Sequence, residues 1–410
     1  MKTMTPSERA PWWRHGLALE RVVTDLVAYE LALARPGRVL PLQPWPPDCD
    51  LVADLGADSL ELMAAATALG DLLGFGQAGM ADGLPGQSLL AGWVEAARAS
   101  LERHDAALVF RTSGSSGAPK RCTHSLASLW REAGALAALL PGRRRVLCAV
   151  PAHHIYGFLF TVLLPQAGSA PLPVIDLRGA SPASLAARLA PGDLVVAHPG
   201  FWAQVAASGP DFPPDVAGVS STAPCPDALA RALARAGLRL LQVYGSSETA
   251  GVGWRDAAGE PYRLLPYWRR AEADNTLERD GAEGVERHAL QDRLVWSGPD
   301  LFVPDGRIDN AVQVGGTNVF PAYVAEVLGM HPGVAACVVR LMRADEGARL
   351  KAFVVPVPGS ADSAHLRATL TAWLAERLSP AECPAAYSFG PALPRQPNGK
   401  LTDWIIDAWE

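Results

Sequence analysis

Short apolar runs alternate with helix-like stretches between residues 106 and 300, and this alternation restricts the fold more than any other feature of the chain. The apolar runs are ALVF at 107–110, VLCAV at 146–150, DLVVAHP at 193–199 and LRLLQVYG at 238–245. Segments with helical character separate them at 125–140, 182–190 and 225–236. Strands that alternate with helices form βαβ units, whose crossovers produce parallel pairing. We therefore predict an α/β core with a mainly parallel sheet.

Two segments with different patterns flank this core. Before it, apolar residues recur at helical spacing at 17–35, 59–73 and 88–100, with Asp58 or Ser59 as the cap of the second helix. After Asp300 come short hairpin-like pieces, a helix at 322–330, strands at 334–343 and 350–357, and a helix at 363–378. We predict three domains: a small helical bundle at 1–103, the α/β core at 104–307 and a small α+β domain at 308–410.

Composition excludes several classes of protein. The formal net charge of −6 and the lack of a long basic stripe argue against a nucleic-acid partner. The six cysteines include no C-x-x-C pair, so neither a zinc site nor a disulfide framework is expected. We find no secretory signal in the first 15 residues and no apolar run approaching the roughly 18 residues that a membrane span needs. A cytoplasmic protein with no membrane span is expected.

A loop rich in glycine and hydroxyl residues follows the strand at 107–110. Glycine lets backbone N–H groups approach a phosphate, the hydroxyls add donors, and the terminal lysine adds positive charge. The spacing is not that of a Walker loop. A plain Ser/Gly turn without function is the alternative. The candidate ATP-binding residues in this loop are Thr112, Ser113, Gly114, Ser115, Ser116, Gly117 and Lys120.

Further motifs follow this loop in the chain: PAHHIYG at 151–157, STAP at 221–224, YGSSET at 244–249 and PRQPNGKL at 394–401. In this order they resemble the motifs of the ANL superfamily of adenylate-forming enzymes, which includes acyl- and aryl-CoA ligases, adenylation domains of peptide synthetases and luciferases. The resemblance runs from the phosphate loop to the C-terminal region. It implies an adenylation core followed by a mobile C-terminal domain, and an enzyme that uses ATP and Mg²⁺.

The resemblance assigns nucleotide-binding roles to two of these motifs. Thr222, Ala223 and Pro224 correspond to the turn that holds adenine. In the motif at 244–249, Tyr244 would pack on adenine, Ser247 would contact the α-phosphate and Glu248 would hold Mg²⁺, with Gly245 and Ser246 completing the site. Ser247 stands where the family usually has threonine. The alternative is a strand end followed by a polar turn.

The motif at 151–157 resembles the family's segment beside the acyl pocket. The matching position, His154, would gate the pocket, lie next to the carboxylate and act as a catalytic residue. A structural role is equally open for His153. The predicted pocket residues are His153, His154, Tyr156, Gly157 and Val243.

The remaining matches lie toward the C-terminus. Asp300 would bind the ribose hydroxyls with Arg307 as its partner, although Asp305 could take that role, and Asp309 would be the hinge. Lys400 would be the catalytic lysine that bridges the carboxylate and the α-phosphate; an exposed lysine on a turn is the alternative. Gln313 and Tyr323 replace the lysine and glutamate that are common in the loop after the hinge, which leaves the geometry of thiol transfer open.

The N-terminal helical segment carries a different resemblance. DLGADSL at 54–60 is similar to the signature of acyl carrier proteins, in which the serine at the position of Ser59 carries 4′-phosphopantetheine. The segment occupies the place of a much longer stretch of adenylation core in typical relatives. Either Ser59 bears a pantetheine arm, or a carrier-like fold is kept as a scaffold, or the motif is a chance match at a helix cap.

Two functions follow from these patterns. The first is an AMP-forming acid–thiol ligase that activates a carboxylic acid, with an aryl acid such as a hydroxybenzoate favoured over a medium-chain acid. The acceptor would be the phosphopantetheine thiol of an acyl carrier protein, in cis or in trans, or CoA. The second is a non-catalytic, truncated relative that acts as a binding or regulatory module.

Overall fold

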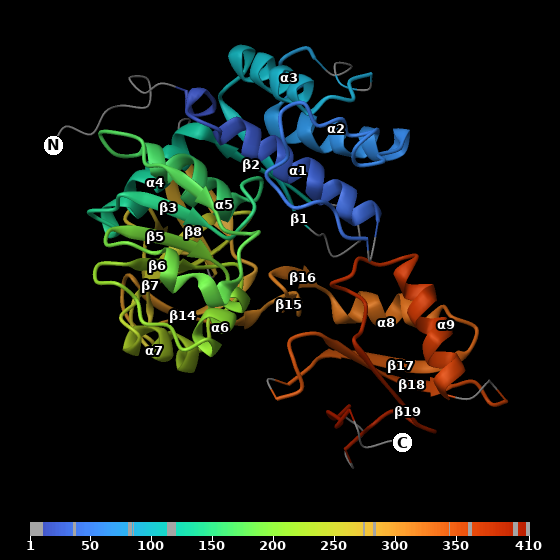
Figure 1. The fold of residues 1–410 in the computed structure, drawn as a ribbon. Helices are drawn as coiled ribbons and strands as arrows, with labels where there is room; N and C mark the ends of the chain where they lie inside the picture. The colour runs from blue at the N-terminus through green and yellow to red at the C-terminus, as the bar shows by residue number, and fades with distance from the viewer. Residues whose placement is uncertain are drawn as a thin grey trace. The chain divides into compact units, whose positions relative to one another are not determined.

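A computed structural model gives the fold of two compact units (Figure 1). It describes residues 11–35, 38–80, 84, 86–112, 120–273, 275–281, 284–343, 345–359, 363–396 and 401–406. The first unit spans Met1–Thr112 and Lys120–Asp305, and the second contains Gly306–Glu410. The division between them falls within two residues of the domain boundary predicted at 307/308.

A nine-stranded sheet forms the centre of the first unit, with the strand order β13-β14-β9-β8-β7-β6-β5-β3-β4. One half is parallel and contains β3 (Arg145–Cys148), β4 (Val174–Asp176), β5 (Asp193–Ala197), β6 (Ala217–Ser220) and β7 (Arg239–Ser246). The other half contains β8 (Ala250–Arg255), β9 (Tyr262–Leu264), β13 (Asp292–Trp296) and β14 (Leu301–Arg307). β7, β8, β9 and β14 pair antiparallel. The predicted α/β fold is confirmed, but its sheet is mixed rather than mainly parallel.

Three helices of the first unit accompany the parallel strands: α4 (Leu126–Leu139), α6 (Pro199–Ala207) and α7 (Asp227–Arg235). The stretch at 182–190, predicted to be helical, forms only two short 3₁₀ turns at Pro182–Ser184 and Ala186–Arg188. A small antiparallel sheet of β10 (Arg269–Arg270), β11 (Thr276–Gly281) and β12 (Gly284–Ala289) accompanies the main sheet.

The strand at 107–110 belongs to a separate hairpin and not to the parallel sheet. β1 (Ala107–Thr112) pairs antiparallel with β2 (Lys120–Ser125) in register from Ala107–Ser125 to Thr112–Lys120. This pairing brings the two ends of the predicted phosphate loop next to each other. The wrong prediction has a simple cause, because an apolar strand before a loop has the same pattern in a hairpin as in a βαβ unit.

The N-terminal segment contributes α1 (Ala18–Ala34), α2 (Ser59–Leu73) and α3 (Leu90–Arg103). Asp58 caps α2 in a capping box with Glu61, as the sequence suggests. These helices share one hydrophobic core with the sheet and with α5 (Ile155–Phe158). Trp12, which is fully buried, packs edge-on against Phe158 with ring centroids 5.0 Å apart. The segment predicted as a carrier-like bundle is thus packed within the first unit.

The second unit is a small α+β domain, as predicted. Its sheet joins β17 (Val334–Leu341), β18 (Leu350–Pro356) and β19 (Ala386–Phe389) and packs with α8 (Pro321–Gly329) and α9 (Ser363–Ala375) around its own core (Figure 1). A hairpin of β15 (Val312–Val314) and β16 (Thr317–Val319) precedes α8.

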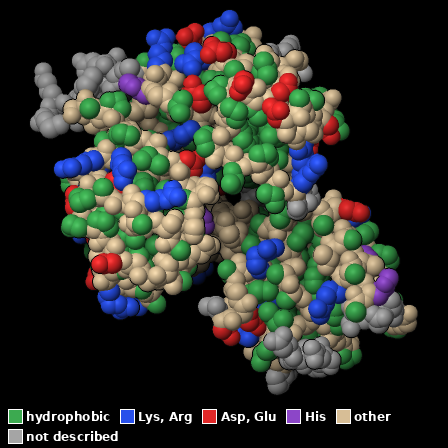
Figure 2. All heavy atoms as spheres, in the orientation of Figure 1, with side chains coloured by type: hydrophobic (Ala, Val, Ile, Leu, Met, Phe, Trp, Pro, Cys, Tyr) green, Lys and Arg blue, Asp and Glu red, His purple; other side chains and the backbone are tan. Residues whose placement is uncertain are grey.

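Charged side chains of both signs are interspersed on the face of the molecule shown in Figure 2. Among the described residues, none of the helices combines the length and apolar character that a membrane crossing requires.

Candidate active site

The predicted nucleotide motifs follow parallel strands at one edge of the main sheet. β6 and β7 are neighbours that end at Ser220 and Ser246, and the turn at 221–224 and the loop at 247–249 begin there. The Ser221 hydroxyl donates to the Val243 carbonyl at 2.8 Å, which ties the turn to β7. Thr222 has a φ of 77°, a left-handed conformation that is rare outside glycine. The carboxyl edge of parallel strands is where α/β folds bind ligands.

An ion pair joins the phosphate-loop strand to this edge. The Lys120 ammonium, at the start of β2, lies 2.9 Å from the Glu248 carboxylate. Burial raises the pKa of Glu248, but the hydrogen bond and charge of Lys120, together with hydrogen bonds from the Glu248 backbone and from Ser246, hold that pKa below its ordinary value. The fold therefore brings together a cationic and an anionic side chain that are 128 positions apart in the chain.

Buried polar groups support the loop that carries Glu248. The His124 ring contacts the Ser247 carbonyl at 2.6 Å, and the Gly251 N–H donates to Glu132 at 2.7 Å. Burial lowers the pKa of His124 to about 4 and raises the pKa of Glu132 to about 8, so both side chains are uncharged near neutral pH. Gly245 is required here, because a Cβ would lie 2.1 Å from the Ala250 carbonyl oxygen.

The two predicted pocket histidines form an aromatic cluster with a helix of the N-terminal segment. The ring centroids of His153 and His154 lie 4.0 Å apart, and the Tyr29 ring of α1 lies 5.0 and 5.2 Å from them. His153 is buried, and neither of its ring nitrogens has a hydrogen-bond partner among the described residues. Burial lowers the pKa of His153 well below its ordinary value and that of His154 to about 4.

The other predicted pocket residues lie in or beside the core of the sheet. The Tyr156 hydroxyl reaches the carbonyls of Ala197 and Val219, at 2.8 and 3.1 Å, so it stabilises the ends of β5 and β6. Gly157 has no room for a side chain, since a Cβ would lie 1.8 Å from the Pro151 carbonyl oxygen. Val243 is buried in β7. Tyr244 is partly buried, and its hydroxyl donates to Asp292 at 2.7 Å.

The predicted ribose and hinge residues form ion pairs within each unit. In the first unit, Asp300 accepts a hydrogen bond of 2.6 Å from Arg263, which the sequence analysis did not identify. In the second unit, Arg307 donates to Asp309 through two nitrogens, at 2.7 and 2.5 Å. The Arg307 guanidinium holds the pKa of Asp309 below its ordinary value. Arg307 and Asp309 thus stabilise the segment where the second unit begins.

The predicted phosphate loop and the predicted catalytic lysine fall in parts of the chain that the structure does not describe. Ser113, Gly114, Ser115, Ser116, Gly117 and Lys400 lie outside the described residues, and Thr112 is described only as the last residue of β1. The chain on both sides of Lys400 is described: Arg395 and Leu401 form an antiparallel bridge, and the Thr402 N–H donates to the Pro394 carbonyl at 3.0 Å. Within the described part of the chain, no group of three or more His, Cys, Asp or Glu side chains is arranged to hold a metal ion.

Sequence reasoning missed the residues that support the site from other elements. Tyr29, Glu132 and Arg279 contact the motifs but belong to none of them; Arg279, which is buried, donates to the Thr249 carbonyl at 3.4 Å. A polar residue inside an apolar helical pattern was the available signal for Glu132.

A sheet with the motifs at 221–224 and 244–249 at the carboxyl edge of its parallel strands, followed by a small α+β domain, is the arrangement that the resemblance to adenylate-forming enzymes predicts. Residues 51–269 match the AMP-binding enzyme family, and residues 323–400 match the AMP-binding enzyme C-terminal domain. The chain belongs to the AMP-binding enzyme family, and its class is that of the AMP-forming acid–thiol ligases. The family and enzyme class predicted from the sequence are confirmed.

Curated relatives cover nearly the whole chain. A 4-coumarate–CoA ligase of Rhodobacter capsulatus is 42% identical over 85% of this chain and 90% of its own length. A 4-coumarate–CoA ligase of Halorhodospira halophila is 40% identical over 93% of this chain and 97% of its own length. The N-terminal segment is therefore shared, at least in part, with relatives named as ligases.

Solved structures show the same fold at lower identity. The amide bond synthetase McbA from Marinactinospora thermotolerans matches 93% of this chain and 92% of its own with a TM-score of 0.58 and 19% identity. A double mutant of o-succinylbenzoate CoA synthetase from Bacillus subtilis matches 73% of this chain and 68% of its own with a TM-score of 0.57 and 20% identity.

Proposed function

We propose that this chain activates an aromatic carboxylic acid with ATP and transfers the acyl group from the adenylate to CoA. The observation that carries the proposal is the contact of 2.9 Å between Lys120 of the phosphate-loop hairpin and Glu248 of the 244–249 motif. Two motifs assigned to ATP by resemblance meet at the edge of the sheet where ligands bind. The non-catalytic alternative loses support, because these residues are kept in a chain that belongs to a ligase class.

Two displacements make up the reaction. In the first, a carboxylate oxygen of the acid bonds to the α-phosphorus while the bond between that phosphorus and the bridging oxygen breaks, and pyrophosphate leaves. In the second, the thiolate sulfur bonds to the acyl carbon and the bond from that carbon to the phosphate oxygen breaks, which releases AMP. Catalysis of the first step depends on positioning and on cations placed where negative charge accumulates.

The residues divide between these tasks. The loop residues Thr112–Gly117 and Lys120 would hold the β- and γ-phosphates, and the turn at 222–224 and Tyr244 would hold adenine. Asp300 would accept from the ribose hydroxyls, with Arg263 fixing its carboxylate. Lys400 would stabilise the charge on the carboxylate and the α-phosphate. Ser247 would donate to the α-phosphate, and His154 would line the path of the carboxylate.

Mg²⁺ fits the residues present at the edge of the sheet. The Glu248 carboxylate is a hard oxygen ligand, and its lowered pKa keeps it ionised near neutral pH. A single protein carboxylate is a common arrangement for Mg²⁺ bound with nucleotide phosphates. When bound there, the ion would reduce the negative charge of the phosphates, and Lys120 would add to this effect.

An aromatic acid is the proposed substrate class. The rings of Tyr29, His153 and His154 form a cluster that suits a planar ring. Relatives named for aromatic acids support this, among them the 4-coumarate–CoA ligases and a p-hydroxybenzoic acid–AMP ligase of Mycobacterium tuberculosis that is 29% identical over 71% of this chain and 47% of its own length.

CoA is the proposed acceptor, and Ser59 is the second candidate. The names of the nearly full-length relatives favour CoA. Ser59 is exposed at the first position of α2, next to Leu60 and Met63, which are also exposed, so its hydroxyl is open to a modifying enzyme. A pantetheine arm on Ser59 would make the acceptor part of the same chain.

Product analysis tests the proposal. Incubation with MgATP, CoA and 4-coumarate or 4-hydroxybenzoate should yield AMP and the aryl-CoA thioester in equal amounts, measured by chromatography and mass spectrometry. AMP without thioester would retain the adenylation and reject CoA as acceptor. Neither product, with any acid in a folded sample, would reject the proposal.

A further inference from the structure

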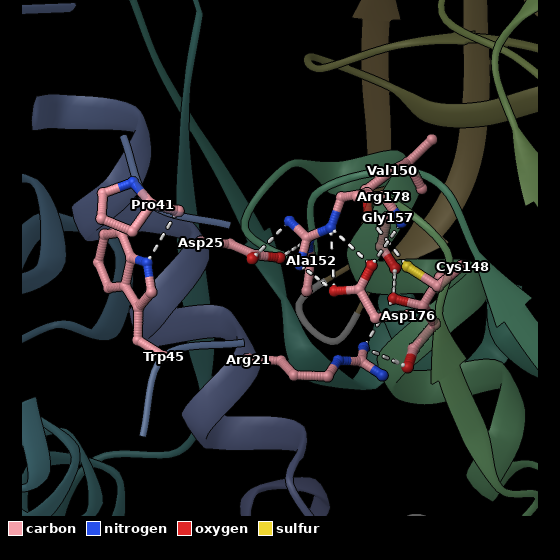
Figure 3. A network of polar contacts seen from close by, with 11 residues as sticks. Arg21, Asp25, Pro41, Trp45, Cys148, Val150, Ala152, Gly157, Asp176 and Arg178 are labelled. Carbon is pink, nitrogen blue, oxygen red and sulfur yellow. Dashed lines mark hydrogen bonds and ion pairs between the residues drawn. The ribbon is translucent and has the colours of Figure 1, made fainter. Parts of the chain in front are cut away.

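Helix α1 is fixed to the segment that carries the two pocket histidines. The Asp25 carboxylate accepts a hydrogen bond of 2.6 Å from the Ala152 N–H, one residue before His153. Arg178 donates to the other oxygen of Asp25 at 2.6 Å and also pairs with Asp176 at the end of β4. Figure 3 shows the Asp25 side chain pointing from α1 toward Ala152 and Arg178. This network is buried at Asp25, so it holds helix and segment in one fixed arrangement.

Tyr29 lies one helical turn after Asp25 and on the same face of α1, because residues four apart are neighbours on a helix. Its ring is tilted by 46° to His153 and meets His154 edge-on at 83°. The residue is 40% exposed, although the rest of α1 is mostly buried. One part of the ring therefore packs on the imidazoles, and another part is open to a ligand.

The His153 ring has unused hydrogen-bonding capacity at the same place. It is 7% exposed, and both of its nitrogens lack a partner among the described residues. A buried polar atom without a partner costs free energy, so such atoms point to a bound group that the ring is arranged to meet. A neutral imidazole can donate from one nitrogen and accept at the other.

We infer that Tyr29 of helix α1 forms one wall of the acid-binding site, stacking on an aromatic ring whose oxygen is hydrogen-bonded by His153. This rests on the proposed function. The ligand class is a planar aromatic acid, and the bonded oxygen belongs either to its carboxylate or to a ring hydroxyl. Tyr29 is thus a specificity residue supplied by the N-terminal helices rather than by the adenylation motifs.

The next residue of α1, Glu30, connects this helix to strand β1. Glu30 lies 3.9 Å from Arg111, which is the residue before Thr112 at the end of β1. Asp71 of α2 pairs with Arg121 of β2 at 2.9 Å. The N-terminal helices therefore contact both strands of the β1–β2 hairpin, and the same helices supply Tyr29 to the proposed acid wall.

Steady-state kinetics of three variants test the inference. Tyr29→Ala should raise KM for the aromatic acid roughly 3- to 10-fold while KM for ATP stays unchanged, and Tyr29→Phe should behave like the parent. The matched control is Leu33→Ala, one turn further along α1, where the side chain is 43% exposed. Should Tyr29→Ala not fold, Tyr29→Leu takes its place.

Equal effects of Tyr29→Ala on both KM values, or an effect no larger than that of Leu33→Ala, would overturn the inference. So would a loss in Tyr29→Phe as large as in Tyr29→Ala. These comparisons need an active parent, so failure of the proposed function appears separately, as no activity of the parent with any aromatic acid.

A second arm identifies the oxygen that His153 bonds. His153→Phe is measured with 4-coumarate and with cinnamate, which lacks the ring hydroxyl. A larger loss with 4-coumarate assigns the bond to the ring hydroxyl, and equal losses assign it to the carboxylate. No loss with either acid overturns this part of the inference.

Discussion

The edge of the sheet that carries the motifs and the N-terminal helices differ in how far their sequences predict what they do. At the edge, a few contiguous residues such as 244–249 carry the polar groups of the proposed ATP site, and Lys120 forms an ion pair with Glu248 there. The helices resemble a carrier protein locally, yet their buried side chains complete the core of the first unit. A short motif therefore predicts a function when its own side chains perform that function, as proposed for 244–249. It does not predict the function of the N-terminal helices, whose buried side chains pack in the core.

The largest expected effect would come from the motif side of this comparison. Lys400→Ala should reduce formation of the adenylate by at least about 10²-fold, because a cation at the reacting phosphate is lost. Transfer from chemically prepared adenylate should change by less than about 3-fold, since that step does not use this charge. The two half-reactions are measured separately. Arg377→Ala, at an exposed arginine of the second unit, is the control. Equal loss in both half-reactions would refute the role of Lys400.

Glu248→Gln should have the next largest effect. The amide keeps the shape of the side chain but loses the charge that would hold Mg²⁺, so the adenylation rate should fall roughly 10²-fold and partly recover at higher Mg²⁺.

Lys120→Met should raise KM for ATP, whereas Arg121→Met, on the next residue of β2, should change that KM by less than about 3-fold. Similar KM values for ATP in Lys120→Met and Arg121→Met would contradict a special role of Lys120 at the nucleotide site, because Arg121 pairs with Asp71 of helix α2 instead.

The stability of the protein should depend on pH through Glu132, which supports the loop that carries Glu248. The folded-state pKa of Glu132 is about 8, above its ordinary value of 4.5, so its contribution to stability is full below 4.5 and is lost as the pH rises toward 8. Glu132→Gln cannot ionise. Its free energy of unfolding should therefore gain on the parent by about 1 kcal/mol per pH unit between those values.

Chemical denaturation at a series of pH values measures this difference. Glu95→Gln, at an exposed glutamate of α3, should show no such slope. A flat difference between Glu132→Gln and the parent would mean that Glu132 is not held neutral behind the loop at 244–251.

The smallest effect is expected at Ser59. If the helices serve as a scaffold and CoA is the acceptor, Ser59→Ala should leave the rate of thioester formation unchanged, because the side chain is exposed and its hydroxyl is not the cap of α2. The cap is Asp58. Intact mass after co-expression with a phosphopantetheinyl transferase gives an independent reading. A mass increase of one pantetheine arm that is absent in Ser59→Ala would establish the carrier role instead.

Much of the fold followed from the sequence because its signals are local. Helices α1, α2, α4 and α7 have a clear 3.6-residue spacing, and the cap at Asp58 marks the start of α2. The parallel strands β3, β5 and β7 are apolar runs that suit burial on both faces. The order of motifs then predicted the family.

The failures have a common physical cause, since each depends on contacts between distant segments. No local sequence pattern indicates that β1 pairs with β2 or that half of the main sheet is antiparallel. The ion pair of Arg263 with Asp300 was not predicted either, because Arg263 reaches Asp300 from β9, 37 positions earlier in the chain. Tyr29 belongs to no motif and acquires its place through the packing of α1 in the core and the contact of Asp25 with Ala152.

ATP–pyrophosphate exchange by the unmodified chain tests the central claim most directly. With MgATP and labelled pyrophosphate, exchange should depend on the acid, and 4-coumarate or 4-hydroxybenzoate should support it far better than medium-chain fatty acids. A preference for fatty acids would contradict the aromatic wall built from Tyr29, His153 and His154. No exchange with any acid, in a sample shown to be folded by its cooperative thermal transition, would contradict the account as a whole.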